Sequence, residues 1–139
     1  MAQMSVEERD AFLRVPRIAK LATLEADGQP TIVPLWFEWD GSVARMFTIH
    51  GTPKLRRIEN DPRAALSVET GVGETEAWVT IEGTVRLTDE DALPLIRRLA
   101  YEYYTPEKAR STLESWEQET RWVVIELTPT RIRSLSPGD

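Results

Sequence analysis

Hydroxyl and basic side chains that could bind an anion lie close together in the segment 48–62. Thr52 has a side chain suited to the N-cap of a helix, and Pro53 suits the first helical position, where its missing N–H would be unpaired anyway. Lys54, Arg56 and Arg57 then add positive charge to the first turn and a half. Because a helix N-terminus is already positive, cations there favour a bound anion, most simply a phosphate. The same pattern also fits a basic helix face that only contacts solvent.

Composition limits the classes of protein to which the chain can belong. Its 139 residues suit one domain (1–139), and 17 Lys plus Arg against 23 Asp plus Glu give a net charge of -6. An acidic chain is not expected to bind nucleic acid generally. It has no cysteine and one histidine, His50, which disfavours thiolate or histidine metal sites and hydrolase triads. No apolar run approaches the length of a membrane helix, so we expect a cytoplasmic protein without a membrane partner.

The order of predicted elements must position the basic segment. Asp27-Gly28 and Asp40-Gly41 are hairpin signals between strands. Pro34 cannot donate to a ladder, so its strand is expected at a sheet edge or at a bulge. We expect a helix at 5–14, strands at 17–24, 31–39 and 43–49, the basic helix, strands at 63–69 and 77–87, helices at 89–104 (bent near Pro94) and 106–119, and a strand at 122–127. Hairpin-joined strands around short helices predict a mainly β fold with peripheral helices, a small antiparallel barrel.

Several short motifs follow one another along the chain: Leu21-Ala-Thr-Leu-Glu-Ala-Asp-Gly-Gln-Pro30, Val33-Pro-Leu-Trp-Phe37, Thr48 with Lys54, Asn60-Asp-Pro-Arg63 and Ile81-Glu-Gly-Thr-Val85. In this order and spacing they resemble the pyridoxamine 5'-phosphate oxidase-like superfamily. The similarity covers roughly 16–87, and the segment 122–133 fits as well. The resemblance implies a split β-barrel, Greek-key-like and homodimeric. It also implies that FMN, or in some branches the deazaflavin coenzyme F-420, binds in grooves at the subunit interface.

The resemblance assigns the basic segment to the cofactor's phosphate. Thr48, Thr52 and Lys54 are the positions implied to contact it, and their hydroxyl and ammonium groups suit an anion. Arg57 lies about one turn beyond Lys54 and could add charge, although a solvent-facing role fits equally well.

The flat ring of the cofactor would lie against the strand that contains Pro34, Leu35 and Trp36, whose backbone groups could address its polar edge. Trp36 could also stack near the ring or border the substrate space. An ordinary edge strand with a bulge is the alternative interpretation of this stretch.

Other aromatic and titratable residues are given structural roles. Trp78 and Trp122 are expected in the core or the dimer interface, and His50 is interpreted as a loop residue without a function. The three tyrosines Tyr101, Tyr103 and Tyr104 are expected to pack a helix against the barrel, with a substrate-pocket edge as the alternative. Gly83 is expected where another backbone or a ligand approaches closely.

No catalytic side chain or metal site is predicted, because in a flavin enzyme the cofactor carries the hydride chemistry. Oxidation of pyridoxamine phosphate itself is disfavoured, because 131–139 contains no histidine for a second phosphate site. The sequence therefore predicts an FMN- or deazaflavin-dependent oxidoreductase acting on an unidentified small molecule. FMN is preferred, because the acidic chain has no obvious basic track for the polyglutamyl tail of coenzyme F-420. A cofactor-storing or sensing protein and a dimeric interaction module are the alternatives.

Overall fold

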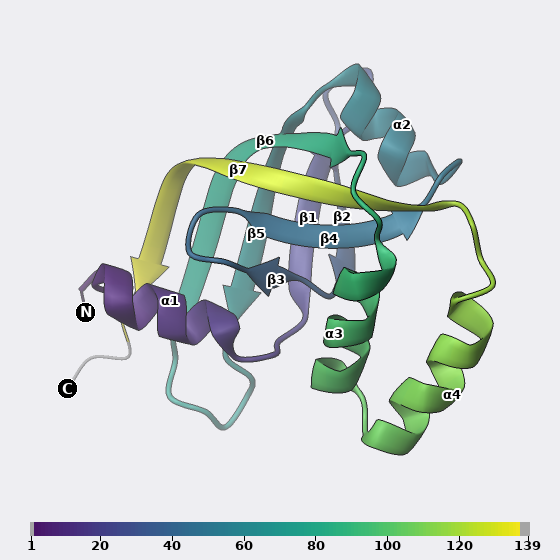
Figure 1. The fold of residues 1–139 in the computed structure, drawn as a ribbon. Helices are drawn as coiled ribbons and strands as arrows, with labels where there is room; N and C mark the ends of the chain where they lie inside the picture. The colour runs from purple at the N-terminus through teal and green to yellow at the C-terminus, as the bar shows by residue number, and fades with distance from the viewer. Residues whose placement is uncertain (1, 137–139) are drawn as a thin grey trace.

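The described residues, 2–136 of the computed structural model, form four helices and one seven-stranded antiparallel sheet (Figure 1). The order of strands in the sheet is β2-β1-β5-β6-β7-β4-β3. In chain order the elements are α1 (Val6–Arg14), β1 (Ala19–Leu24), β2 (Pro30–Leu35), β3 (Glu38–Trp39), β4 (Ala44–Ile49), α2 (Pro53–Asn60), β5 (Arg63–Glu69), β6 (Trp78–Thr88), α3 (Leu93–Tyr103), α4 (Pro106–Trp116) and β7 (Trp122–Leu135). The long strands β6 and β7 pair with each other near the middle of the sheet. The shorter strand β5 pairs with β6, and β4 pairs with β7.

The sheet curls so that alternate residues of its strands face one core. Leu21, Met46 and Ile125 are completely buried members of this core, one from each of three strands. Helix α1 covers one end of the curl and α2 covers the other, as Figure 1 shows. The α2 side chains Leu55 and Ile58 belong to the same core. The expected mainly β, antiparallel barrel with peripheral helices is therefore confirmed.

A second hydrophobic cluster lies on the outside of the curl, where α3 and α4 pack against β4 and β7. Leu95, Leu99 and Leu113 are buried in it against Val124 of β7. Its partly buried members are mostly aromatic: Trp36, Phe47, Tyr103, Tyr104, Trp116 and Trp122. The prediction that the tyrosines pack a helix against the barrel is confirmed for Tyr103 and Tyr104, whereas Tyr101 is exposed.

The close backbone approach expected at Gly83 is confirmed. The register between β6 and β7 shifts between Glu82 and Gly83, and a Cβ built on Gly83 would lie 2.0 Å from the carbonyl oxygen of Thr128. This irregularity also accommodates Pro129 inside β7, because proline is tolerated at bulges. The strand predicted to end at Leu127 therefore continues to Leu135.

Two other predicted boundaries were wrong. The strand predicted at 31–39 is interrupted after Leu35, so its end forms the separate strand β3. The helix predicted to bend at Pro94 instead starts at Leu93, which places the proline in the first turn, where it needs no N–H partner. Among residues 2–136, none of the helices combines the length and the hydrophobicity needed to cross a membrane.

Candidate functional site

Helix α2 begins as the sequence predicted, with one difference at its cap. Thr52 occupies the N-cap position and Pro53 is in the first turn, but the Thr52 side chain makes no capping hydrogen bond. Its Oγ1 is buried and has no hydrogen-bond partner among residues 2–136. A buried hydroxyl without a partner is costly, so this atom is available to a ligand at the helix start.

Lys54 follows Thr52 by two residues, in the first turn of α2, and is half-buried. Burial lowers the pKa of its ammonium group, and the positive charge of Arg57 lowers that pKa further. Within residues 2–136 no carboxylate lies within ion-pair distance of Lys54. An anion bound here would relieve both the burial cost and the repulsion.

Arg57 is turned toward the sheet and not toward solvent. Its Nε donates a 2.8 Å hydrogen bond to Oγ1 of Thr23, and its NH1 lies 3.3 Å from Oε1 of Glu25. The same carboxylate oxygen accepts a hydrogen bond of 3.2 Å from the hydroxyl of Thr31 at the start of β2. The Arg57 side chain is only 10% exposed, so the solvent-facing interpretation was wrong.

Thr23 and Glu25 were missed by the sequence reasoning. Thr23 occupies an inward position of β1, and a hydroxyl at a buried position of an alternating strand signals a specific partner. Glu25 follows the same strand and carries no comparable local signal. Only the pairing of β1 with β2 and the packing of α2 bring these groups to Arg57.

Thr48 lies near the end of β4, and two residues later the chain leaves the strand for the loop that leads into α2. Its side chain is 8% exposed and faces the inner side of the curl. The backbone N–H of His50 bonds to the carbonyl of Arg121, and the His50 side chain is exposed. Thr48, Thr52, Lys54 and Arg57 thus belong to one strand-loop-helix unit, while any cofactor contact of Thr48 stays a prediction.

The predicted ring-facing residues lie at the far end of β2, which is an edge strand paired only with β1. Pro34 is exposed, whereas Leu35 is partly buried against the barrel core. The edge position predicted from Pro34 is therefore confirmed. The backbone on the free side of β2 is available to a ligand along the whole strand.

Trp36, another predicted site residue, has its side chain packed against the aromatic residues of α3 and its C-terminus. Its indole stacks on Tyr103 at a centroid distance of 5.1 Å and meets Tyr104 edge-on at 4.8 Å. The hydroxyl of Tyr103 donates to the carbonyl of Arg17 at 2.7 Å. These contacts attach the end of β2 to α3 and α4. They fix the backbone at Trp36, and the Trp36 indole packs within the protein.

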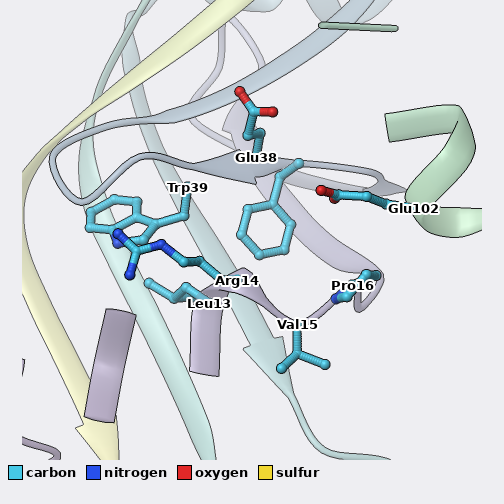
Figure 2. A pocket seen from close by; sticks show the side chains of 8 residues that line it. Leu13, Arg14, Val15, Pro16, Glu38, Trp39 and Glu102 are labelled. Carbon is cyan, nitrogen blue, oxygen red and sulfur yellow. The ribbon is translucent and has the colours of Figure 1, made fainter. Parts of the chain in front are cut away.

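Two further hollows lie on the α1 side of the barrel, away from α2. One of about 270 Å3, shown in Figure 2, has Glu102 reaching toward it from α3 and Arg14 from the end of α1. Burial raises the pKa of Glu102, and neighbouring Glu38 raises it further. None of the predicted site residues lines this hollow, nor the larger one of about 590 Å3 between α1 and the 70–77 loop. Within residues 2–136 no group of acidic or histidine side chains could hold a metal ion.

Comparison with known proteins identifies the family. The family model described as pyridoxamine 5'-phosphate oxidase matches residues 5–136. A biliverdin reductase of Mycobacterium tuberculosis (strain CDC 1551 / Oshkosh) that depends on reduced coenzyme F-420 is 33% identical over 100 residues, which cover 69% of this chain and 70% of that protein.

Solved structures share the fold. A conserved hypothetical protein from Mycobacterium tuberculosis matches with a TM-score of 0.76 at 25% identity, over 96% of this chain and 86% of the other. An F-420 reductase matches with a TM-score of 0.70 at 24% identity, over 93% of this chain and 96% of the other. The motifs noted in the sequence, the curled sheet and these matches agree, and the chain belongs to the pyridoxamine 5'-phosphate oxidase family, with its split β-barrel fold.

Proposed function

We propose that this chain is an oxidoreductase that binds a flavin-type cofactor, coenzyme F-420 in preference to FMN, and transfers hydride to or from a small molecule. The observation that carries the proposal is the start of α2. There Thr52 Oγ1 is a buried hydroxyl without a hydrogen-bond partner, and two residues later the half-buried ammonium group of Lys54 has no carboxylate partner, both among the described residues. This is the donor set that a phosphate group requires.

The relative placement of α2 and β2 suits the two ends of such a cofactor. Arg57 and Glu25 connect α2 to Thr31 at the start of β2. From Thr31 to Pro34 the strand advances about 10 Å, at a rise of about 3.3 Å per residue. A phosphate at α2 would therefore leave the ribityl chain to follow β2 and the ring to reach Pro34, Leu35 and the backbone of Trp36.

The choice of deazaflavin rests on the relative and on the charges at α2. The 33% identical relative depends on reduced coenzyme F-420. The phosphate of coenzyme F-420 is a diester with a single negative charge. Among residues 2–136 Lys54 has no ion-pair partner, whereas Arg57 is paired with Glu25. FMN is the second candidate, supported by the net charge of -6, which offers little to a polyglutamyl tail.

In this proposal the residues of the chain bind and orient, and none is catalytic. The bound cofactor supplies the hydride chemistry at its ring. Lys54, Thr52 and Thr48 hold the phosphate end, Arg57 holds the first strand against α2, and β2 presents its free edge to the ring. The cluster around Trp36 keeps the end of β2 in place.

The second copy that this family uses would cover the outer face of β1, β2, β5 and β6. Ile32 is 64% exposed there, and it lines a hollow of about 190 Å3 together with the small residues Ala22 and Ala65. Thr80 Oγ1 on the same face is buried and has no hydrogen-bond partner within the described part of the chain. An exposed apolar strip of this kind favours a self-association surface, so we propose a homodimer with the cofactor groove at its interface.

Titration of the purified chain with coenzyme F-420 and, separately, with FMN tests the proposal. Ring fluorescence is the readout, and riboflavin, which lacks the phosphate, is the control ligand. We expect tighter binding of F-420 than of FMN and weak binding of riboflavin. If none of the three binds, the protein is an interaction module and the proposal fails. If F-420 binds but the reduced cofactor is never oxidised by any acceptor tried, a storage role is favoured.

A further inference from the structure

Arg57 already forms a hydrogen bond and an ion pair within the protein itself. Its guanidinium group is 10% exposed and contacts Thr23 at 2.8 Å and Glu25 at 3.3 Å. Thr23 is buried, so the arginine is anchored on the inside of β1, while the carboxylate of Glu25 remains 45% exposed at the mouth of the site. The hydroxyl of Thr31 holds that carboxylate in place.

Glu25 therefore offsets part of the positive charge at the proposed phosphate position. Lys54 and Arg57 contribute two positive charges and Glu25 one negative charge, which leaves one net positive charge. Other charged groups around the site are Arg56 on the exposed side of α2, which lines a hollow of about 130 Å3 with Glu25 and Arg57, and Asp27 in the exposed β1–β2 turn.

We propose that Glu25 determines which phosphate the site accepts: by pairing with Arg57 it favours a singly charged phosphate diester over a doubly charged phosphate monoester. The inference rests on the proposed function, because it concerns the same cradle at α2. A carboxylate at the mouth of the site repels a dianion about twice as strongly as a monoanion at the same distance. It also withholds Arg57, the group best suited to bidentate phosphate binding.

The size of the effect follows from electrostatics. At an effective dielectric constant near that of a protein surface, one extra charge about 10 Å from a carboxylate alters affinity on the order of tenfold. The diester of coenzyme F-420 suits the remaining single positive charge, and the monoester of FMN does not.

The variant Glu25→Gln tests this inference, because glutamine keeps the size and an oxygen acceptor for Arg57 and Thr31 but removes the charge. Dissociation constants for FMN and coenzyme F-420 are measured by ring fluorescence at pH 7.5 for both proteins. We expect F-420 affinity to rise on the order of tenfold and FMN affinity on the order of a hundredfold, because the phosphodiester of F-420 gains half the energy that the doubly charged monoester gains. The FMN titration is repeated at pH 5.5, below the second phosphate pKa of about 6. There the gain in FMN affinity caused by Glu25→Gln should fall toward the gain in F-420 affinity.

Thr31→Val is the matched control, because it removes the hydroxyl that holds Glu25 and keeps the carboxylate charge. The ratio of F-420 affinity to FMN affinity in this variant should stay close to the ratio in the original chain. An equal gain for both cofactors in Glu25→Gln, or the same shift of preference in Thr31→Val, would overturn the inference and leave the proposed function standing. Failure of both cofactors to bind the original chain would overturn the two together.

Discussion

At the scale of single residues, the start of α2 combines groups that are unfavourable for the cofactor-free protein. Thr52 Oγ1 is buried without a partner, and Lys54 is half-buried next to Arg57. Such costs persist in functional sites because a ligand removes them. Two predictions about Lys54 separate its role in binding from its role in stability.

The variant Lys54→Ala should bind its cofactor about 1.5–3 kcal/mol more weakly, the range for losing a hydrogen bond to a charged group. Ring-fluorescence titration measures this change. Arg110→Ala is the control, because Arg110 is exposed on α4 and removes the same charge away from the site. Unchanged affinity in Lys54→Ala would remove Lys54 from the phosphate site.

The variant Lys54→Met should melt at a higher temperature than the original chain when no cofactor is present. Burial and Arg57 lower the pKa of Lys54 in the folded state, so charged Lys54 opposes folding. This penalty is fully present below the lowered pKa and disappears as the pH rises through it toward 10.5, the ordinary pKa of a lysine side chain. The gain in melting temperature should therefore be present at pH 7 and shrink as the pH approaches that value. A lower melting temperature for Lys54→Met at pH 7 would contradict this account.

At the scale of elements, two packing contacts fix the strands that carry the proposed site. One is the bulge at Gly83, where β6 and β7 approach so closely that no side chain fits. The other is the aromatic cluster that attaches the end of β2 to α3 and α4.

Gly83→Ala should destabilise the protein by about 1–3 kcal/mol, the usual cost of overpacking, because its Cβ would lie 2.0 Å from the carbonyl oxygen of Thr128. Chemical denaturation measures the free energy of unfolding. Gly71→Ala is the control, since its new Cβ would meet only the end of the flexible Glu74 side chain. Equal small effects in both variants would mean that β6 and β7 can separate at little cost.

Trp36→Ala should lower the free energy of unfolding by about 3 kcal/mol, at the lower end of the range for deleting a packed aromatic side chain, since the indole is only partly buried. Trp36→Phe should recover most of this loss, because a phenyl ring can still stack on Tyr103. Cofactor affinity should fall in the alanine variant as well, since the end of β2 loses its attachment. If the alanine variant has normal stability, the aromatic cluster does not fix the end of β2 to α3 and α4.

At the scale of the whole molecule, the outer face of β1, β2, β5 and β6 is the surface that we propose for a second copy. Ile32→Glu should produce a monomer at micromolar concentration, because it places a charge in the middle of the exposed apolar strip. Light scattering measures the mass, and Val72→Glu, at an exposed loop tip, is the control. A monomeric original chain would contradict the dimer, and a dimeric Ile32→Glu would place the interface elsewhere.

Local chemistry allowed much of the fold to be predicted from the sequence. The Ser5 capping box, the proline starts of α2 and α4 and the Asp-Gly turns depend on neighbouring residues, so they appear in the sequence as they do in the structure. The edge position of β2 followed from one missing N–H at Pro34.

The tertiary structure alone decided which distant groups meet. The sequence placed Lys54 and Thr52 at a helix start, but it did not reveal that Arg57 would be held by Thr23 and Glu25. Those contacts need β1, β2 and α2 to pack together, and pairing between strands follows from the whole sheet and from no local pattern. The sequence thus predicted a basic helix start with a threonine cap and a proline, and the fold decided how much of its positive charge remains unpaired.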